Sequence, residues 1–143
     1  MEWLGTITVA GLVVLAILIW LFLRTRSKDL IEEMMVKRRS TSRLVTRADF
    51  VEGMNHFPVL LALTDDALFY ENPELQASID RSRIDEVEYD DELAIGKSVP
   101  HGGVLRLRSH GQMIEFVVDD ASAKQWKTAL PGRVLGDPNA AAV

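Results

Sequence analysis

Two glycine-containing segments carry residue types that enzymes use for catalysis. Gly96-Lys97-Ser98 matches the end of a phosphate-binding loop, but that loop needs a glycine where this chain has Asp91, and no strand–loop–helix pattern surrounds it. His101-Gly102-Gly103 matches the composition of an esterase oxyanion loop, yet no G-x-S-x-G segment supplies a nucleophile. We therefore interpret both segments as loops and expect neither nucleotide nor ester chemistry.

Metal and cofactor chemistry are equally poorly supported. The chain has no cysteine, and its three histidines, His56, His101 and His110, fall at predicted loops or turns. Zinc needs three or four converging ligands. We expect no metal, no cofactor and no catalytic residue, and hence a protein that is not an enzyme.

The most unusual polar segment is the acidic run from Asp85 to Glu92. If 84–90 is a strand, Glu86, Glu88 and Asp90 share one face of it. Three interpretations stay open: a solvated face that deters edge-to-edge pairing, a calcium site, or a docking face for a basic partner. That partner could be the chain's own segment 24–47, which has eight basic and three acidic side chains.

The element that positions everything else is an uncharged stretch of twenty residues, 4–23. As a helix it spans about 30 Å, the thickness of the hydrocarbon core of a bilayer. A cleaved signal peptide is the alternative, but the segment before the stretch is acidic and no small-residue cleavage site follows. We predict a retained transmembrane anchor, residues 1–23.

Basic residues follow the span and none precedes it, so the N-terminus is predicted to lie outside and the rest of the chain in the cytoplasm, on a single-pass protein of the inner or plasma membrane. Residues 24–43 are predicted to form a basic amphipathic juxtamembrane helix, about 28–39 with Ser27 as its N-cap, and a linker. Its apolar stripe, Leu30, Ile31, Met34 and Met35, is expected to pack on its own domain or on a second copy, or to lie on anionic headgroups. The membrane-surface residues of this segment are predicted to be Arg24, Arg26, Lys28, Lys37, Arg38 and Arg39.

From residue 44 the hydrophobic pattern changes to the period of strands. Seven strands are predicted, at 45–52, 57–63, 67–71, 75–79, 84–90, 103–109 and 112–118. With His110-Gly111 as a two-residue turn, Leu107 faces Ile114, Leu105 faces Phe116, and Arg106 faces Glu115. The pairing puts apolar residues together on one face and opposite charges on the other.

A helix follows the last predicted strand. Asp119 or Asp120 can cap it, Trp126 lies on its apolar face, and Pro131-Gly132 ends it. We expect Trp126 to act as a plug for the open end of a bent sheet. The tail, 132–143, has nothing to bury and is predicted to be disordered.

The segments PVLLALTDDALFYEN and IDRSRIDEVEYDD, with a tryptophan in the closing helix, resemble the bacterial PH-like (pleckstrin-homology-like and GRAM-like) domains over residues 44–131. The resemblance implies a mainly β PH-like barrel, a bent antiparallel sheet of seven strands capped by a C-terminal α-helix, here on a single transmembrane anchor. A small OB-type barrel is the rival fold. Phosphoinositide binding is not carried over, because the loop between the first two strands, 52–56, has no lysine or arginine.

Charge excludes one further class of partner. Residues 48–143 carry eight basic and seventeen acidic side chains, a poor composition for nucleic acid. The leading functional prediction is a non-enzymatic membrane protein whose cytoplasmic domain binds a protein partner or a second copy. The alternative is anionic-lipid sensing, or another regulatory role at the membrane surface, through the basic juxtamembrane helix.

Overall fold

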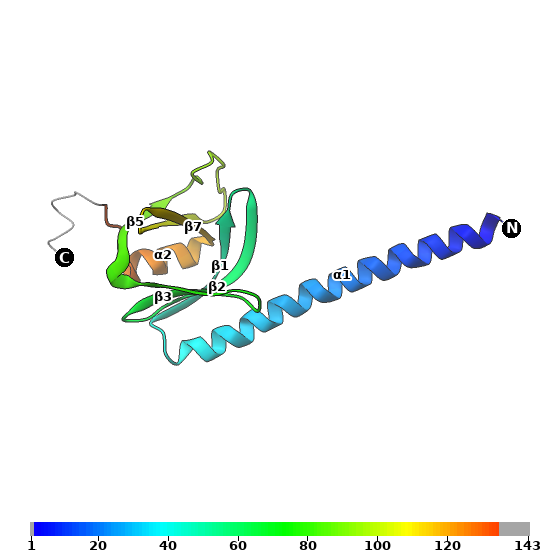
Figure 1. The fold of residues 1–143 in the computed structure, drawn as a ribbon, viewed down its shortest axis with the longest axis horizontal. Coiled ribbons are helices and arrows are strands. Elements are labelled where there is room, and N and C mark those ends of the chain that lie inside the picture. The colour runs from blue at the N-terminus through cyan, green and yellow to red at the C-terminus, as the bar shows by residue number, and fades with distance from the viewer. Residues whose placement is uncertain (1, 135–143) are drawn as a thin grey trace.

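The structure, a computed structural model, describes residues 2–134, and the side chains of 9–26 and 28–134. A long N-terminal helix, α1 (Glu2–Arg39), leads into a seven-stranded antiparallel sheet, and a second helix, α2 (Asp120–Ala129), follows the last strand (Figure 1). Helix α1 extends far beyond the β domain, and among the described side chains it is those of its C-terminal part that pack on the domain.

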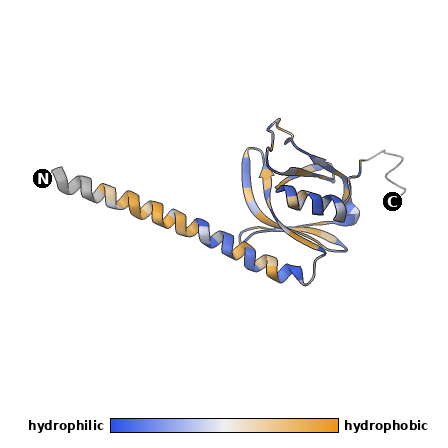
Figure 2. Cartoon of the chain, turned by 180° about the vertical axis from the view of Figure 1, so that it is seen from behind, coloured by the Kyte–Doolittle hydropathy of each residue, from blue (hydrophilic) through white to orange (hydrophobic). Residues whose placement is uncertain are grey.

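Helix α1 is the one helix in the described residues that is long and apolar enough to cross a membrane. Its apolar side chains from Val9 to Leu23 are exposed to the surroundings, and the apolar stretch gives way to a polar one near Arg24 (Figure 2). Within the part of the chain that the structure describes, nothing covers this apolar surface.

The structure corrects the expected start of the juxtamembrane helix. A separate juxtamembrane helix with Ser27 as its N-cap was expected, but α1 runs without a break from Glu2 to Arg39. No glycine or proline lies between Trp20 and Arg39 to interrupt the helix. The hydroxyl of Thr25 bonds back to the carbonyls of Leu21 and Phe22, at 3.1 and 2.9 Å, so it does not compete with the helix.

The seven predicted strands are all present, four of them with the predicted bounds. They are β1 (Leu44–Glu52), β2 (Asn55–Leu63), β3 (Ala67–Glu71), β4 (Gln76–Asp80), β5 (Ile84–Asp90), β6 (Gly103–Ser109) and β7 (Gln112–Val118). A single 3-10 turn, η1 (Arg81–Arg83), links β4 to β5. The strand order is β4-β3-β2-β1-β7-β6-β5, all antiparallel.

The predicted β6–β7 hairpin is confirmed in its register. Leu107 pairs with Ile114, Leu105 with Phe116, and Arg106 with Glu115. His110 and Gly111 form the turn with φ values of 51° and 74°, the left-handed conformations that a tight hairpin of this twist needs.

The sheet is not closed into a barrel, because β4 and β5 remain separate edges. The edge of β5 is partly covered by the segment after α2, where Val87 and Arg133 exchange backbone hydrogen bonds of 2.7 and 2.8 Å. This pairing corrects the start of the predicted disordered tail, since Arg133 belongs to the sheet edge. Residues 135–143 of that tail lie outside the described residues.

The sheet curves around α2, which lies on its concave side (Figure 1). Trp126 is fully buried there among apolar side chains from both ends of the sheet, including Leu61, Leu105 and Phe116. The N-cap of α2 is Asp119, whose carboxylate accepts a hydrogen bond of 2.7 Å from the backbone N–H of Ser122.

Candidate functional site at the junction of the long helix and the sheet

The C-terminal part of α1 packs on the outer face of β1, β2 and β3. Ile31 and Met35 are 5% and 8% exposed and form a second core with Leu60 and Ala62, separate from the one around Trp126. Successive side chains of β2 therefore alternate: every second one packs in the inner core, and those between them pack against α1. Three surfaces were considered as the partner of the apolar stripe of residues 28–39. Its residues Ile31 and Met35 pack on the chain's own β domain.

An ion pair joins the end of α1 to the end of β3. Arg38 donates to the Glu71 carboxylate through Nε at 3.0 Å and also through Nη2, and its guanidinium lies 4.1 Å from the centre of the Phe69 ring. Glu71 is only 7% exposed, so its charge depends on this partner. The hydrogen bond to Glu71 raises the pKa of Arg38, while burial opposes the shift.

Six basic residues of α1 were predicted to lie at the membrane surface, and in the structure they have different environments. Arg38 is committed to Glu71, and Lys37 pairs with Glu33 at 3.2 Å one helical turn earlier. Arg26 and Arg39 are exposed. The remaining two, Arg24 and Lys28, lie on the side of α1 that faces the domain.

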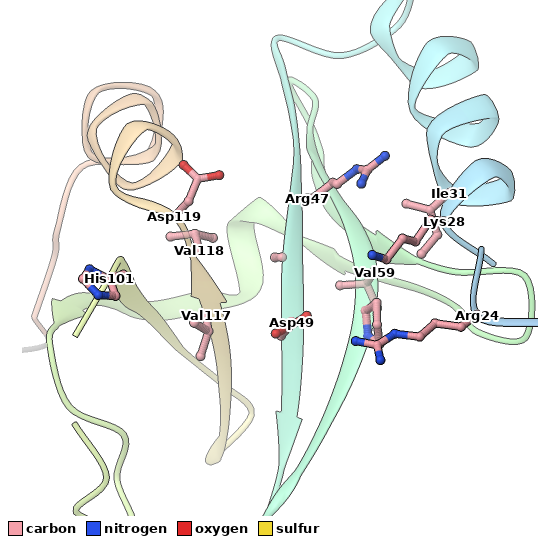
Figure 3. A pocket seen from close by; sticks show the side chains of 12 residues that line it. Arg24, Lys28, Ile31, Arg47, Asp49, Val59, His101, Val117, Val118 and Asp119 are labelled. Carbon is pink, nitrogen blue, oxygen red and sulfur yellow. The ribbon is translucent and has the colours of Figure 1, made fainter. Parts of the chain in front are cut away.

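Arg24 and Lys28 line a cavity of about 390 Å³ between α1 and the outer side of the sheet. Figure 3 places them on α1, with Asp49 on the facing strand and with His101 and Asp119 beyond it. The cavity is lined by Arg24, Lys28, Ile31, Arg47, Ala48, Asp49, Pro58, Val59, His101, Val117, Val118 and Asp119.

The charges around this cavity are arranged by element. The cationic Arg24 and Lys28 come from α1, and Arg47 on β1 is engaged with Glu32 of α1 at 3.0 Å. The carboxylates of Asp49 and Asp119 come from the sheet side. Sequence reasoning missed Asp49, Asp119 and His101 here, although the strand period already put Arg47 and Asp49 on one face of β1.

The carboxylates of the predicted docking face on β5 form ion pairs within the sheet. Glu86 pairs with Arg108 at 3.2 Å, and Arg106 pairs with Glu88 at 3.0 Å and with Asp90 at 3.3 Å. The chain's own segment 24–47 was one candidate partner for these carboxylates; the ion pairs they make are instead with β6, the neighbouring strand.

Arg106 is the centre of this network. It also bonds to Glu115 at 3.0 Å and to the carbonyl oxygen of Glu92 at 2.9 Å, which holds the start of the loop between β5 and β6. Burial lowers the pKa of Arg106, but its hydrogen bonds to Glu88, Glu115 and Asp90 raise it by more, so that the pKa lies above its usual value. The backbone N–H of Asp91, followed by Arg106, lowers the pKa of Asp90.

Hydrogen bonds of the Trp126 and Tyr89 side chains help to join α2 and the residues that follow it to the sheet. The Nε1–H of Trp126 donates to Oγ1 of Thr46 at 2.7 Å, and both residues are buried. The hydroxyl of Tyr89 donates to the carbonyl oxygen of Leu130 at 2.5 Å, and burial raises the pKa of Tyr89 well above its usual value.

Within residues 2–134, no group of three or more histidine, aspartate or glutamate side chains is arranged to hold a metal ion. Gly96-Lys97-Ser98 lies in the loop between β5 and β6, where Gly96 has a φ of 84°. No protein-family model, no curated protein and no solved structure matches this chain.

Proposed function

We propose that this chain is a single-pass membrane protein with its N-terminus outside and its β domain in the cytoplasm. The uncharged stretch 4–23 and the exposed apolar side chains of α1 support a span. Arg24, Arg26 and Lys28 follow directly, on the domain side, as the positive-inside rule requires for a cytoplasmic domain.

Within that arrangement we infer that the domain is PH-like and works as a non-enzymatic module that binds a protein partner. One observation carries this proposal: the span passes without a break into the part of α1 that packs on the sheet. Ile31, Met35 and the Arg38–Glu71 pair fix the domain to the helix, so it faces the membrane in one orientation. A fixed orientation suits a domain that presents a binding surface at a set height above the leaflet.

The PH-like assignment draws its support from the fold order. Seven antiparallel strands form one strongly bent, open sheet, and a C-terminal helix with a buried tryptophan fills its concave side. Fold alone is an analogy for function. The docking face formed by Glu86, Glu88 and Asp90 remains a prediction, and its ion pairs with Arg106 and Arg108 mean that charge reversal there tests folding as well as docking.

The absence of cysteine makes the topology directly testable. A single cysteine is introduced at the exposed Lys97 of the β5–β6 loop, in the full chain, and intact cells are treated with a membrane-impermeant maleimide. We expect labelling only after the cells are opened. Labelling in intact cells would place the domain outside and overturn the proposed orientation.

The partner is tested with photo-crosslinking side chains placed at exposed positions on different sides of the domain, Glu74, Lys97 and Lys124, in native membranes. We expect one position to capture one recurrent protein while the others do not. Crosslinks only to lipid or to a second copy would remove the interaction module as proposed.

A further inference from the structure

The cavity between α1 and the sheet is lined by cations from α1 and by carboxylates from the other side, where the cationic Arg47 is paired with Glu32 of α1. Arg24 and Lys28 supply a cationic wall from α1, while Asp49 and Asp119 supply carboxylates from the other side (Figure 3). Between them the lining is apolar, including Val59, Val117 and Val118. A purely anionic ligand would meet the two carboxylates, and a purely cationic one would meet Arg24 and Lys28.

The cavity lies beside the part of α1 where the uncharged stretch ends. Arg24 is the first charged residue after the uncharged stretch, and its guanidinium lies 5.2 Å from the centre of the Trp20 ring. In the proposed membrane placement, tryptophan and arginine at the end of a span lie at the level of the lipid headgroups. Lys28 is one helical turn further into the cytoplasm.

The strand β1 runs beside α1 toward the membrane. Val45 packs in the core around Met35, Arg47 pairs with Glu32, and Asp49 lines the cavity together with Arg24. Moving along β1 from Val45 therefore means moving along α1 toward its span. The cavity is the part of the junction that lies nearest the bilayer.

We propose that this cavity binds the headgroup of a zwitterionic phospholipid that carries a phosphate and a primary amine, as in phosphatidylethanolamine. Arg24 and Lys28 take the phosphate, and Asp49 accepts hydrogen bonds from the ammonium group, while Asp119, the N-cap of α2, adds negative charge on the same side of the cavity. This assignment rests on the proposed membrane placement and adds a specific ligand to it. A trimethylated amine cannot donate these hydrogen bonds, and a glycerol headgroup lacks the positive charge.

The test uses the full chain in nanodiscs made of equal parts phosphatidylethanolamine, phosphatidylglycerol and phosphatidylcholine. The protein is released with mild detergent, and native mass spectrometry identifies the lipid that stays bound. We expect one retained phosphatidylethanolamine. Lys28→Gln and Asp49→Asn should each reduce its retention about tenfold, the effect of losing one charge-assisted hydrogen bond.

The controls separate the cavity from general charge. Arg39→Gln removes an exposed cation from the same helix, and Asp85→Asn removes an exposed carboxylate from β5; both should leave retention unchanged. Retention of phosphatidylglycerol equal to or above that of phosphatidylethanolamine, or unchanged retention in Asp49→Asn, would overturn the proposal. Flotation of each variant with vesicles reports membrane insertion separately, so a failure of the placement is distinguished from a failure of the headgroup site.

Discussion

The indole N–H of Trp126 donates to Oγ1 of Thr46 at 2.7 Å, which joins α2 to the first strand of the sheet across 80 residues of sequence. The hydrogen bond satisfies the polar atom of the largest side chain in the core and at the same time the hydroxyl of a buried threonine. Burying an indole on the concave side is therefore possible without leaving a donor unpaired.

Replacement of this tryptophan should weaken the domain strongly. We expect Trp126→Ala to reduce the free energy of unfolding by about 3–5 kcal/mol, because the side chain is fully buried and its removal leaves a cavity. Trp126→Phe keeps much of the apolar contact but removes the donor to Thr46, and should cost about 1–3 kcal/mol. Urea denaturation of the full chain in detergent measures both; an unchanged midpoint in Trp126→Ala would contradict the plug.

Two glycines with positive φ should respond differently to alanine. At Gly102, with φ of 137°, an added Cβ would lie 2.1 Å from the carbonyl oxygen of Val118. At Gly53, with φ of 61°, it would meet nothing within 4 Å. We expect Gly53→Ala to cost about 1–2 kcal/mol from backbone conformation alone, and Gly102→Ala about 3 kcal/mol or more. Equal melting temperatures for the two variants would show that the close approach at Gly102 is easily relieved.

The Arg38–Glu71 ion pair should contribute more to the free energy of unfolding than the exposed Arg47–Glu32 pair. Arg38→Gln leaves a nearly buried carboxylate without its cation and should cost about 2–3 kcal/mol. Arg47→Gln removes the partner of Glu32 in a pair whose side chains are about half exposed or more, and should cost less than about 1 kcal/mol.

A double-mutant cycle isolates this coupling. The variant with both Arg38→Gln and Glu71→Gln should be more stable than Arg38→Gln alone, because no buried charge remains unpaired. If the double variant loses the sum of the two single effects, the pair does not join α1 to the sheet energetically.

The carboxylate of Asp90 gives a pH dependence of known sign. Its pKa lies below the usual 3.8 in the folded protein, because the backbone N–H of Asp91 and the guanidinium of Arg106 bond to the charged form. The resulting stabilisation is complete above the unfolded-state pKa and is lost as the pH falls through the lower folded-state pKa. The stability difference between wild type and Asp90→Asn should therefore be present at neutral pH and shrink below about pH 4.

This prediction is checked by urea denaturation between neutral pH and about pH 3. Asp85→Asn, an exposed carboxylate of the same strand, is the matched control. A difference between wild type and Asp90→Asn that stays constant across the acidic range would show that the hydrogen bonds to Asp90 do not favour its charged form.

Sequence patterning predicted the β domain well because its signals are local. The period-2 segments and the His110-Gly111 turn determine the β6–β7 register, and the opposite charges of Arg106 and Glu115 follow from it. The role of Arg106 could be predicted only in part. Its bonds to Glu88 and Asp90 depend on β5 lying beside β6, a non-local pairing that no single segment specifies.

The junction with α1 was the hardest part to predict. The uninterrupted apolar run 58–63 in β2 is typical of a strand buried on both faces, and it was the available signal that something covers the outer face. The stripe with Ile31 and Met35 was recognised, but its partner was left open between three surfaces. The cavity charges Asp49 and Asp119 come together through the packing of three distant segments, which sequence spacing does not reveal.

The uninterrupted α1 also makes the domain sensitive to helical phase. Each residue added between Leu23 and Arg24 would lift the domain by about 1.5 Å and rotate it by about 100° around the helix axis. In the proposed membrane placement, one added residue would turn the β domain to a different side of the helix axis, while seven would raise it by about 10 Å and return it nearly to its original orientation. An activity that depends on the orientation of the domain around the helix axis would thus be lost and regained with the period of the helix. An activity that requires only attachment to the helix would be unaffected by the insertions.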